Sequence, residues 1–142
     1  MTLDTDCIFC KIIKGEIPSF KIFEDEATLA FMDINPGNTG HALAIPKHHT
    51  PDFLEAPEKW LTATMMTAQK VALAVERTLE PHGINIVVAH GPGAAQSVFH
   101  LHVHVLPRAK GDDLRMNWGL VPGDMDAICE VAERIKANLG SV

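Results

Sequence analysis

His100-Leu101-His102-Val103-His104 is the stretch of this 142-residue chain that decides its fold and points to its chemistry. Histidine alternates with an apolar residue, and a period of two is typical of a β-strand. We therefore expect Leu101, Val103 and Val105 to enter a core, and the three imidazoles to share the other face, about 7 Å apart. Three alternating imidazoles are costly on a sheet unless they bind or react with something, so we expect a functional site there.

The rest of the chain carries further strand patterns around one long helix pattern. Strand patterns bounded by turn residues and prolines predict five strands, over residues 20–24, 28–34, 41–45, 84–89 and 98–106. Residues 20–24 and the histidine strand alternate, whereas 84–89 is an apolar, partly β-branched run. Pro57 suits the first turn of a helix, and Pro81-His82-Gly83 would end it. Between them lies an apolar stripe with helical spacing: Leu61, Met65, Ala68, Ala72, Val75 and Leu79. This order predicts an α+β fold with a mostly antiparallel sheet.

Both ends of the chain also carry helix patterns. Residues 7–17 predict a short helical turn that ends near Gly15. Asp124 is expected to cap a C-terminal helix that Gly140 stops. The length suits one compact domain, so residues 1–142 are expected to form a single domain.

Charge and hydropathy exclude several classes of function. The net charge of −6 and the pI of about 5.7 argue against broad binding of nucleic acids or anionic membranes. No apolar run approaches the roughly 20 residues that span a bilayer. The acidic start of the chain lacks the basic and apolar regions of a signal peptide. We expect a cytoplasmic protein without nucleic-acid or membrane partners.

The surroundings of the three histidines favour a nucleophile over a catalytic metal. No Asp or Glu lies between Glu80 and Asp112, whereas hydrolytic metal sites often include a carboxylate. Neutral imidazole is a good nucleophile near pH 7, and an anionic phosphate is repelled by carboxylates. The preceding loop, with Gly91, Gly93 and Ser97, lets main-chain N–H groups approach phosphate oxygens. A metal-dependent hydrolase stays an alternative.

Cys7 and Cys10 form a second motif. With an odd total of three cysteines they make a poor disulfide framework, and their spacing indicates metal or redox chemistry in a reducing compartment. Two thiolates supply half of a tetrahedral zinc shell. A redox pair and two ordinary buried thiols are the alternatives. Cys129, Met65 and Met66 are expected to be buried without a function.

These residues resemble the histidine triad (HIT) family, whose signature is His-x-His-x-His with apolar residues between. The resemblance covers nearly the whole chain, through residues 7–18, 31–36, 40–41, 45–49 and 96–108. It implies a HIT-like fold and a homodimer. It also implies hydrolysis or transfer at the α-phosphorus of purine nucleoside monophosphate derivatives, such as phosphoramidates, acyl-nucleotides or dinucleoside polyphosphates.

The resemblance also implies residue roles. His102 would become a nucleotidyl-histidine that water hydrolyses. His104 and Ser97 would contact the phosphate and the leaving group, and His41 and His100 would belong to the same catalytic cluster. The nucleotide-binding set would comprise Asp33 on the ribose, the base-pocket residues Ile8, Phe9, Ile12, Phe31 and Ile34, and the loop residues Gln96 and Ser97. Simple core packing is the alternative for each base-pocket residue.

In zinc-bearing members of the family, two histidines complete the shell of the cysteine pair. Here these would be His49 and His100 around a structural zinc, with His48 as the alternative to His49. One departure is Ala89, where the family usually has an asparagine that helps to order the phosphate site. That departure keeps a nucleotide-binding regulatory module with little turnover as the alternative function. Arg115 and Trp118 would contact the leaving group or pack a dimer interface.

Overall fold

The structure is a computed structural model that describes residues 1–141. These residues fall into two compact units, Met1–Asp112 and the residues from Asp113 onward, and each is described by itself. The prediction of a single domain over residues 1–142 stays a prediction. No helix of the described residues is long and apolar enough to cross a membrane.

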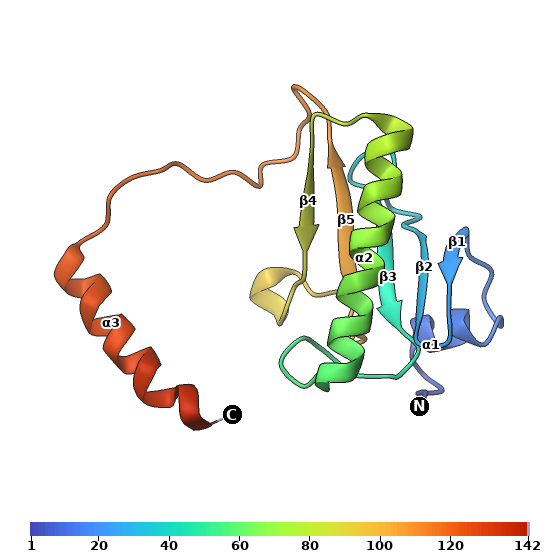
Figure 1. The fold of residues 1–142 in the computed structure, drawn as a ribbon, viewed down its shortest axis with the longest axis horizontal. Helices are drawn as coiled ribbons and strands as arrows, with labels where there is room; N and C mark the ends of the chain where they lie inside the picture. Colours follow the sequence, from blue (N-terminus) through green and yellow to red (C-terminus); the bar gives the residue numbers. More distant parts are fainter. Residues whose placement is uncertain (142) are drawn as a thin grey trace. The chain divides into compact units, whose positions relative to one another are not determined.

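The first unit is built on one antiparallel five-stranded sheet, which confirms the α+β prediction (Figure 1). The strand order is β1-β2-β3-β5-β4. The strands are β1 (Lys21–Glu24), β2 (Thr28–Met32), β3 (Ala42–Pro46), β4 (Gly83–Val87) and β5 (Val103–Arg108). The helices of this unit are α1 (Ile8–Ile13), α2 (Glu58–Leu79) and the 3₁₀ turn η1 (Pro92–Ala94).

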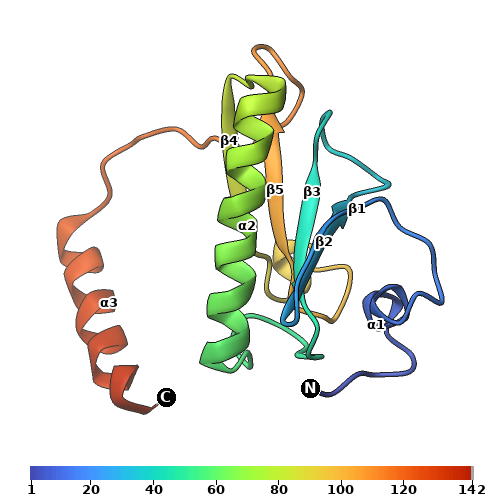
Figure 2. The ribbon, with the colours of Figure 1, turned by 45° about the vertical axis from the view of Figure 1, so that its right-hand side comes forward.

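Strands β2 and β3 are buried on both faces, because α2 and α1 lie on opposite sides of them (Figure 2). Small residues meet α2, where Ala30, Ala42 and Ala44 pack with Ala68 and Val71. Large residues meet α1 on the other face, where Phe9 packs with Leu29, Phe31, Leu43 and Ile45. The alanine surface lets α2 approach the sheet closely. The α1 face, with its bulkier residues, is the face that carries the site.

The predicted stripe of α2 is wrong at Met65 and Leu79, which are exposed by 38% and 43%. Met66, also expected to be buried, is exposed by 57%, whereas Thr64 and Thr67 are buried. The hydroxyl of Thr67 lies 2.7 Å from that of Thr28, so a polar pair is satisfied against the sheet. Close packing on small residues selects short side chains on this helix face. The helix ends at Leu79, and its C-cap residue Glu80 takes the left-handed conformation with φ 46°.

Strand β5 begins at Val103, so the predicted start at residue 98 is wrong. The N–H of Leu101 donates to the carbonyl of Thr50 at 2.8 Å, in a loop contact rather than in the ladder of the sheet. The predicted alternation nevertheless holds, because Leu101, Val103 and Val105 are all buried. His102 and His104 therefore point to the α1 face of the sheet, and the segment before the strand is held by other loops.

The second unit consists of an extended segment, α3 (Met125–Asn138) and the 3₁₀ turn η2 (Leu139–Ser141). The predicted cap is confirmed, because the carboxylate of Asp124 accepts a hydrogen bond from the N–H of Ala127 at 2.9 Å. The predicted stop at Gly140 is wrong, because η2 runs through that residue. Cys129 is exposed rather than buried, since no described residue of α3 is buried.

Candidate active site and metal centre

A cavity of about 430 Å³ lies on the α1 face of the sheet. The predicted base-pocket residues Ile8, Phe9, Ile12, Phe31 and Ile34 all line it. So do the polar residues Asp33, His41, Ser97, His102 and His104. A second hollow of about 580 Å³, near Arg108 and Lys110, contains none of the predicted site residues. The structure therefore brings most of the predicted catalytic and nucleotide-binding residues together around one cavity.

His102 is held in one tautomer by the main chain. Its Nδ1 lies 2.7 Å from the carbonyl oxygen of His100. A carbonyl can only accept, so Nδ1 carries the proton and Nε2 keeps its lone pair. The side chain is largely buried, with its ring 5.2 Å from that of Phe9, and burial lowers the pKa of His102. A neutral imidazole with a bare Nε2 is the form that attacks phosphorus.

His41 and His104 form a directed pair. The N–H of Gly37 donates to Nδ1 of His41 at 2.9 Å, so the proton of a neutral His41 sits on Nε2. That Nε2 lies 2.8 Å from Nδ1 of His104 and donates to it. The proton of His104 is thereby placed on its own Nε2. Hydrogen-bond geometry thus makes His104 a donor, whereas His102 keeps an acceptor nitrogen.

Burial keeps these imidazoles uncharged. It lowers the pKa of His104 to about 4, and the neighbouring His102 and His41 act in the same direction. It also lowers the pKa of His41, although the nearby carboxylate of Asp33 opposes this shift. Oδ2 of Asp33 lies 3.6 Å from Nε2 of His41. The cavity therefore presents neutral nitrogen groups at neutral pH.

The loop before the triad is braced by Gln96. Its Oε1 accepts from the N–H of Gly91 at 3.0 Å, and its Nε2 donates to the carbonyls of Pro51 and Val98 at 2.8 and 3.2 Å. Gln96 is buried in the loop and does not line the cavity, unlike Ser97. It supports the wall that carries the Ser97 hydroxyl.

Part of the main chain of this loop is already engaged. The N–H groups of Gly91, Ala94 and Ala95 donate within the loop. Ala95 adopts φ 60°, a left-handed conformation that costs a residue with a Cβ about 1 kcal/mol or more. We know of no sequence signal that would have predicted this closed arrangement, because it depends on the Gln96 side chain.

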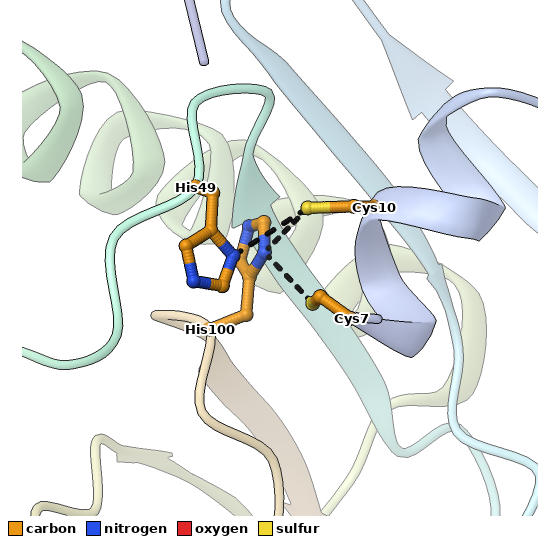
Figure 3. A group of neighbouring side chains, drawn as sticks. All are labelled: Cys7, Cys10, His49 and His100. Atoms are coloured by element: carbon orange, nitrogen blue, oxygen red, sulfur yellow. Dashed lines mark hydrogen bonds between the residues drawn. The ribbon is translucent and has the colours of Figure 1, made fainter. Parts of the chain in front are cut away.

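Cys7, Cys10, His49 and His100 converge on one point (Figure 3). The cysteine Sγ atoms lie 3.4 Å (Cys7) and 3.5 Å (Cys10) from Nδ1 of His100, and Cys10 Sγ lies 3.5 Å from Nδ1 of His49. Tetrahedral zinc, with Zn–S near 2.3 Å and Zn–N near 2.0–2.1 Å, places sulfur and nitrogen about 3.6 Å apart. The donor set and its spacing therefore fit a zinc ion whose four positions are filled by protein.

The main chain also prepares this cluster. Nε2 of His100 donates to the carbonyl of Pro46 at 2.9 Å, which leaves the Nδ1 lone pair facing the sulfurs. Burial lowers the pKa of His100 to about 4 and raises that of Cys10 to about 11. A bound dication would reverse the second effect, because it favours thiolates.

His100 and His48 do not take every role considered for them. His100 does not line the cavity. Its carbonyl oxygen accepts from Nδ1 of His102, which does line the cavity. His48 accepts from the N–H of Thr2 at 3.0 Å and stacks on Trp60, so His49 is the histidine that faces the cysteines. Arg115 and Trp118 belong to the second unit, and their contacts stay predictions.

Sequence reasoning missed the backbone groups that orient the histidines. These are the N–H of Gly37 and the carbonyls of Pro46 and His100. No residue type signals them. It also missed several cavity residues that lie beside the motifs it found: Ile17, Pro18, Ser19, Met32, Asn35, Leu43 and Val98. Proximity to those motifs was the available signal.

Comparison with known proteins gives one consistent family. The HIT domain model matches residues 14–111. Adenosine 5'-monophosphoramidase HNT1 of Saccharomyces cerevisiae is 40% identical over 139 residues, which are 97% of this chain and 85% of that protein. A HIT family structure from Bacillus subtilis has a TM-score of 0.87 at 38% identity, covering 94% of this chain and 97% of that one. A zinc-bound histidine triad protein from Mycobacterium smegmatis has a TM-score of 0.73 at 36% identity, covering 96% of each chain.

Proposed function

This chain belongs to the HIT family, and from that premise we propose that it is a nucleotide hydrolase that works through a nucleotidyl-histidine. The family includes named hydrolases of adenosine nucleotides, such as the monophosphoramidase of yeast. The proposed substrates are purine nucleoside monophosphate derivatives, including phosphoramidates, acyl-nucleotides and dinucleoside polyphosphates. The observation that carries the proposal is the bare Nε2 of a neutral His102 inside the cavity.

The reaction would run in two displacements. Nε2 of His102 forms a bond to the α-phosphorus while the bond from phosphorus to the leaving group breaks. The leaving group takes a proton, for which Nε2–H of His104 and the hydroxyl of Ser97 are the available donors. A water molecule then attacks the same phosphorus and gives a proton to the group that protonated the leaving group, which restores that group. His102 departs with its electron pair, and the nucleoside monophosphate is released. Neutral histidines support this scheme, because attack needs a lone pair and protonation of the leaving group needs an N–H.

The remaining cavity residues suit the nucleoside. Ile8, Phe31 and Ile34 offer an apolar surface for a purine. The Asp33 carboxylate, at the same cavity, can accept hydrogen bonds from ribose hydroxyls. This pattern of apolar walls with a few polar groups is typical of small-molecule sites.

We also propose that Cys7, Cys10, His49 and His100 hold a structural zinc ion. Bound there, the ion would supply a cross-link and no reactive position. It would join α1, the loop after β3 and the residue whose carbonyl orients His102. The homodimer and the cytoplasmic location stay predictions, although a reducing compartment suits a site built on thiolates.

The test uses an adenosine phosphoramidate and the variant His102→Asn. We expect the variant to lose roughly 10⁴-fold or more in kcat, because its nucleophile is gone. The exposed His90→Asn is the matched control and should keep activity within a few fold. Parent protein denatured at alkaline pH during turnover should carry a nucleotidyl adduct on His102 by peptide mass spectrometry. Full turnover by His102→Asn, or an adduct on another residue, would contradict the mechanism.

A binding module with little turnover is the second candidate. It is favoured by Ala89, which offers no side-chain amide where the family usually has an asparagine that helps to order the phosphate site. Tight binding of a nucleoside monophosphate together with no turnover by the parent would select the module over the enzyme.

A further inference from the structure

The loop between β2 and β3 contains the group that fixes the proton positions of the histidine pair. The N–H of Gly37 donates to Nδ1 of His41, and His41 then donates to His104. Neither Gly37 nor its neighbour Asn38 lines the cavity. The tautomer of a cavity histidine is thus determined by a backbone group outside the cavity.

Asn38 anchors this loop from the side opposite His41. Its Nδ2 donates to the carbonyl of Pro107 at 3.0 Å and to Oδ2 of Asp112 at 2.8 Å. Asp112 is itself held by a two-pronged ion pair with Arg108, with N···O distances of 2.8 and 2.9 Å. The carbonyl of Asn38 accepts from the N–H of His41 at 3.1 Å. The residue next to the Gly37 donor is therefore fixed to the end of β5 and to His41.

We propose that Asn38 is a positioning residue that, by holding the Gly37 N–H on His41, keeps the proton of His104 on Nε2 for transfer to the leaving group. This inference rests on the proposed function and adds a control on its proton-transfer step. If the Gly37 N–H leaves Nδ1 of His41, that nitrogen can take the proton, and His41 then presents a bare Nε2. Nδ1 of His104, which faces it, must then carry the proton to keep the hydrogen bond. Nε2 of His104 therefore has no proton to give to the leaving group.

The consequence depends on the leaving group. An amine expelled from a phosphoramidate must gain a proton, so it needs Nε2–H of His104. A 4-nitrophenolate is a stable anion and leaves without one. General acid catalysis contributes about 10²–10⁴-fold where it is needed. Loss of the directed pair should therefore slow the first substrate selectively.

The experiment compares three variants on two adenosine monophosphate derivatives, a phosphoramidate and a 4-nitrophenyl ester. Gly37→Pro removes the N–H, Gly37→Ala retains it, and Asn38→Ala removes the anchor. For Gly37→Pro and Asn38→Ala, we expect kcat on the phosphoramidate to fall at least tenfold more than kcat on the ester. For Gly37→Ala, we expect the ratio to stay that of the parent. An equal loss on both substrates would indicate a merely structural role and would overturn the proposal.

Imidazole ¹⁵N NMR provides a second readout that does not need turnover. The parent should show His41 and His104 both protonated at Nε2. Asn38→Ala and Gly37→Pro should show protonation shifted toward Nδ1 in both rings. Parent-like tautomers in both variants would refute the inference even if the enzyme proved active. If the parent shows no turnover but the two variants still show the tautomer shift, the positioning role of Asn38 is supported and only the proposed function is contradicted.

Discussion

Removing one thiol from the metal centre tests the link between zinc and the fold. Cys7→Ser is the suitable change, because Cys7 is only partly buried whereas Cys10 is fully buried. The pair Cys7 and His100 is separated by 93 residues. A cross-link over that length removes about 4.6 kcal/mol of chain entropy from the unfolded state. The second closure, Cys10 to His49, spans 39 residues within the first and adds less.

We therefore expect Cys7→Ser to lower the free energy of unfolding of the zinc-loaded protein by about 3–5 kcal/mol. For a folded unit of this size that corresponds to a fall in Tm of about 12–20 °C. Urea unfolding under reducing conditions, with stoichiometric zinc or with a chelator, measures the difference. The chelator should lower the free energy of unfolding of the parent to that of Cys7→Ser, and it should leave that of the variant unchanged. Metal analysis should find one zinc per parent chain.

Cys129→Ser is the matched control, because that thiol is exposed and lies outside the cluster. It should unfold at the parent's urea concentration. The reasoning is refuted if Cys7→Ser unfolds with the parent, or if the parent contains no zinc and ignores the chelator. If the urea midpoint of the parent changed with oxidant and not with zinc, Cys7 and Cys10 would be better explained as a redox pair.

Two further changes test the scaffold around the histidines. Gly40→Ala should destabilise the fold by about 1–3 kcal/mol in urea unfolding, because φ is +89° and the new Cβ would overlap the side chain of Leu79. Asp112→Asn should lower Tm at pH 7, because hydrogen bonding to Arg108 holds the pKa of Asp112 well below its usual range. A carboxylate with a depressed folded-state pKa stabilises above its unfolded value near 3.9, and this contribution is lost as the pH falls below that value. Thermal melts should thus show the deficit of Asp112→Asn shrinking between pH 5 and pH 3.

Each of these changes has a matched control in the chain. Gly93→Ala meets no atom within 4 Å in the described residues and should change stability by less than about 0.5 kcal/mol. Asp113→Asn removes the same charge at an exposed neighbour of Asp112 and should show no such pH dependence. Equal effects of Gly40→Ala and Gly93→Ala, or a pH-independent deficit for Asp112→Asn, would contradict the two explanations.

The sequence predicted the fold where side-chain period alone determines burial. Alternation identified the strand that carries the histidines, and the buried Leu101, Val103 and Val105 follow from it. The sequence pattern failed where burial of a side chain depends on the surface that its element packs against. Thr64 replaces Met65 on the buried face of α2 because that face lies on alanines. Such outcomes depend on a partner surface that periodicity does not contain.

The same limit explains why the sequence could gather the site histidines but could not assign their separate chemistry. Residue type makes them equivalent, and the backbone makes them different. A carbonyl on Nε2 of His100 leaves the lone pair of its Nδ1 facing the cysteines, and a carbonyl on Nδ1 of His102 leaves the lone pair of its Nε2 facing the cavity. An N–H on Nδ1 of His41 has the opposite effect and makes Nε2 a donor. If Nε2 of His41 bound a metal ion, Nδ1 would have to carry the proton. The N–H of Gly37 already donates to Nδ1, so this hydrogen bond argues against a catalytic metal at the cavity. One alternating motif can thus supply both the proposed structural site and the proposed reactive site, because each ring meets a different main-chain group.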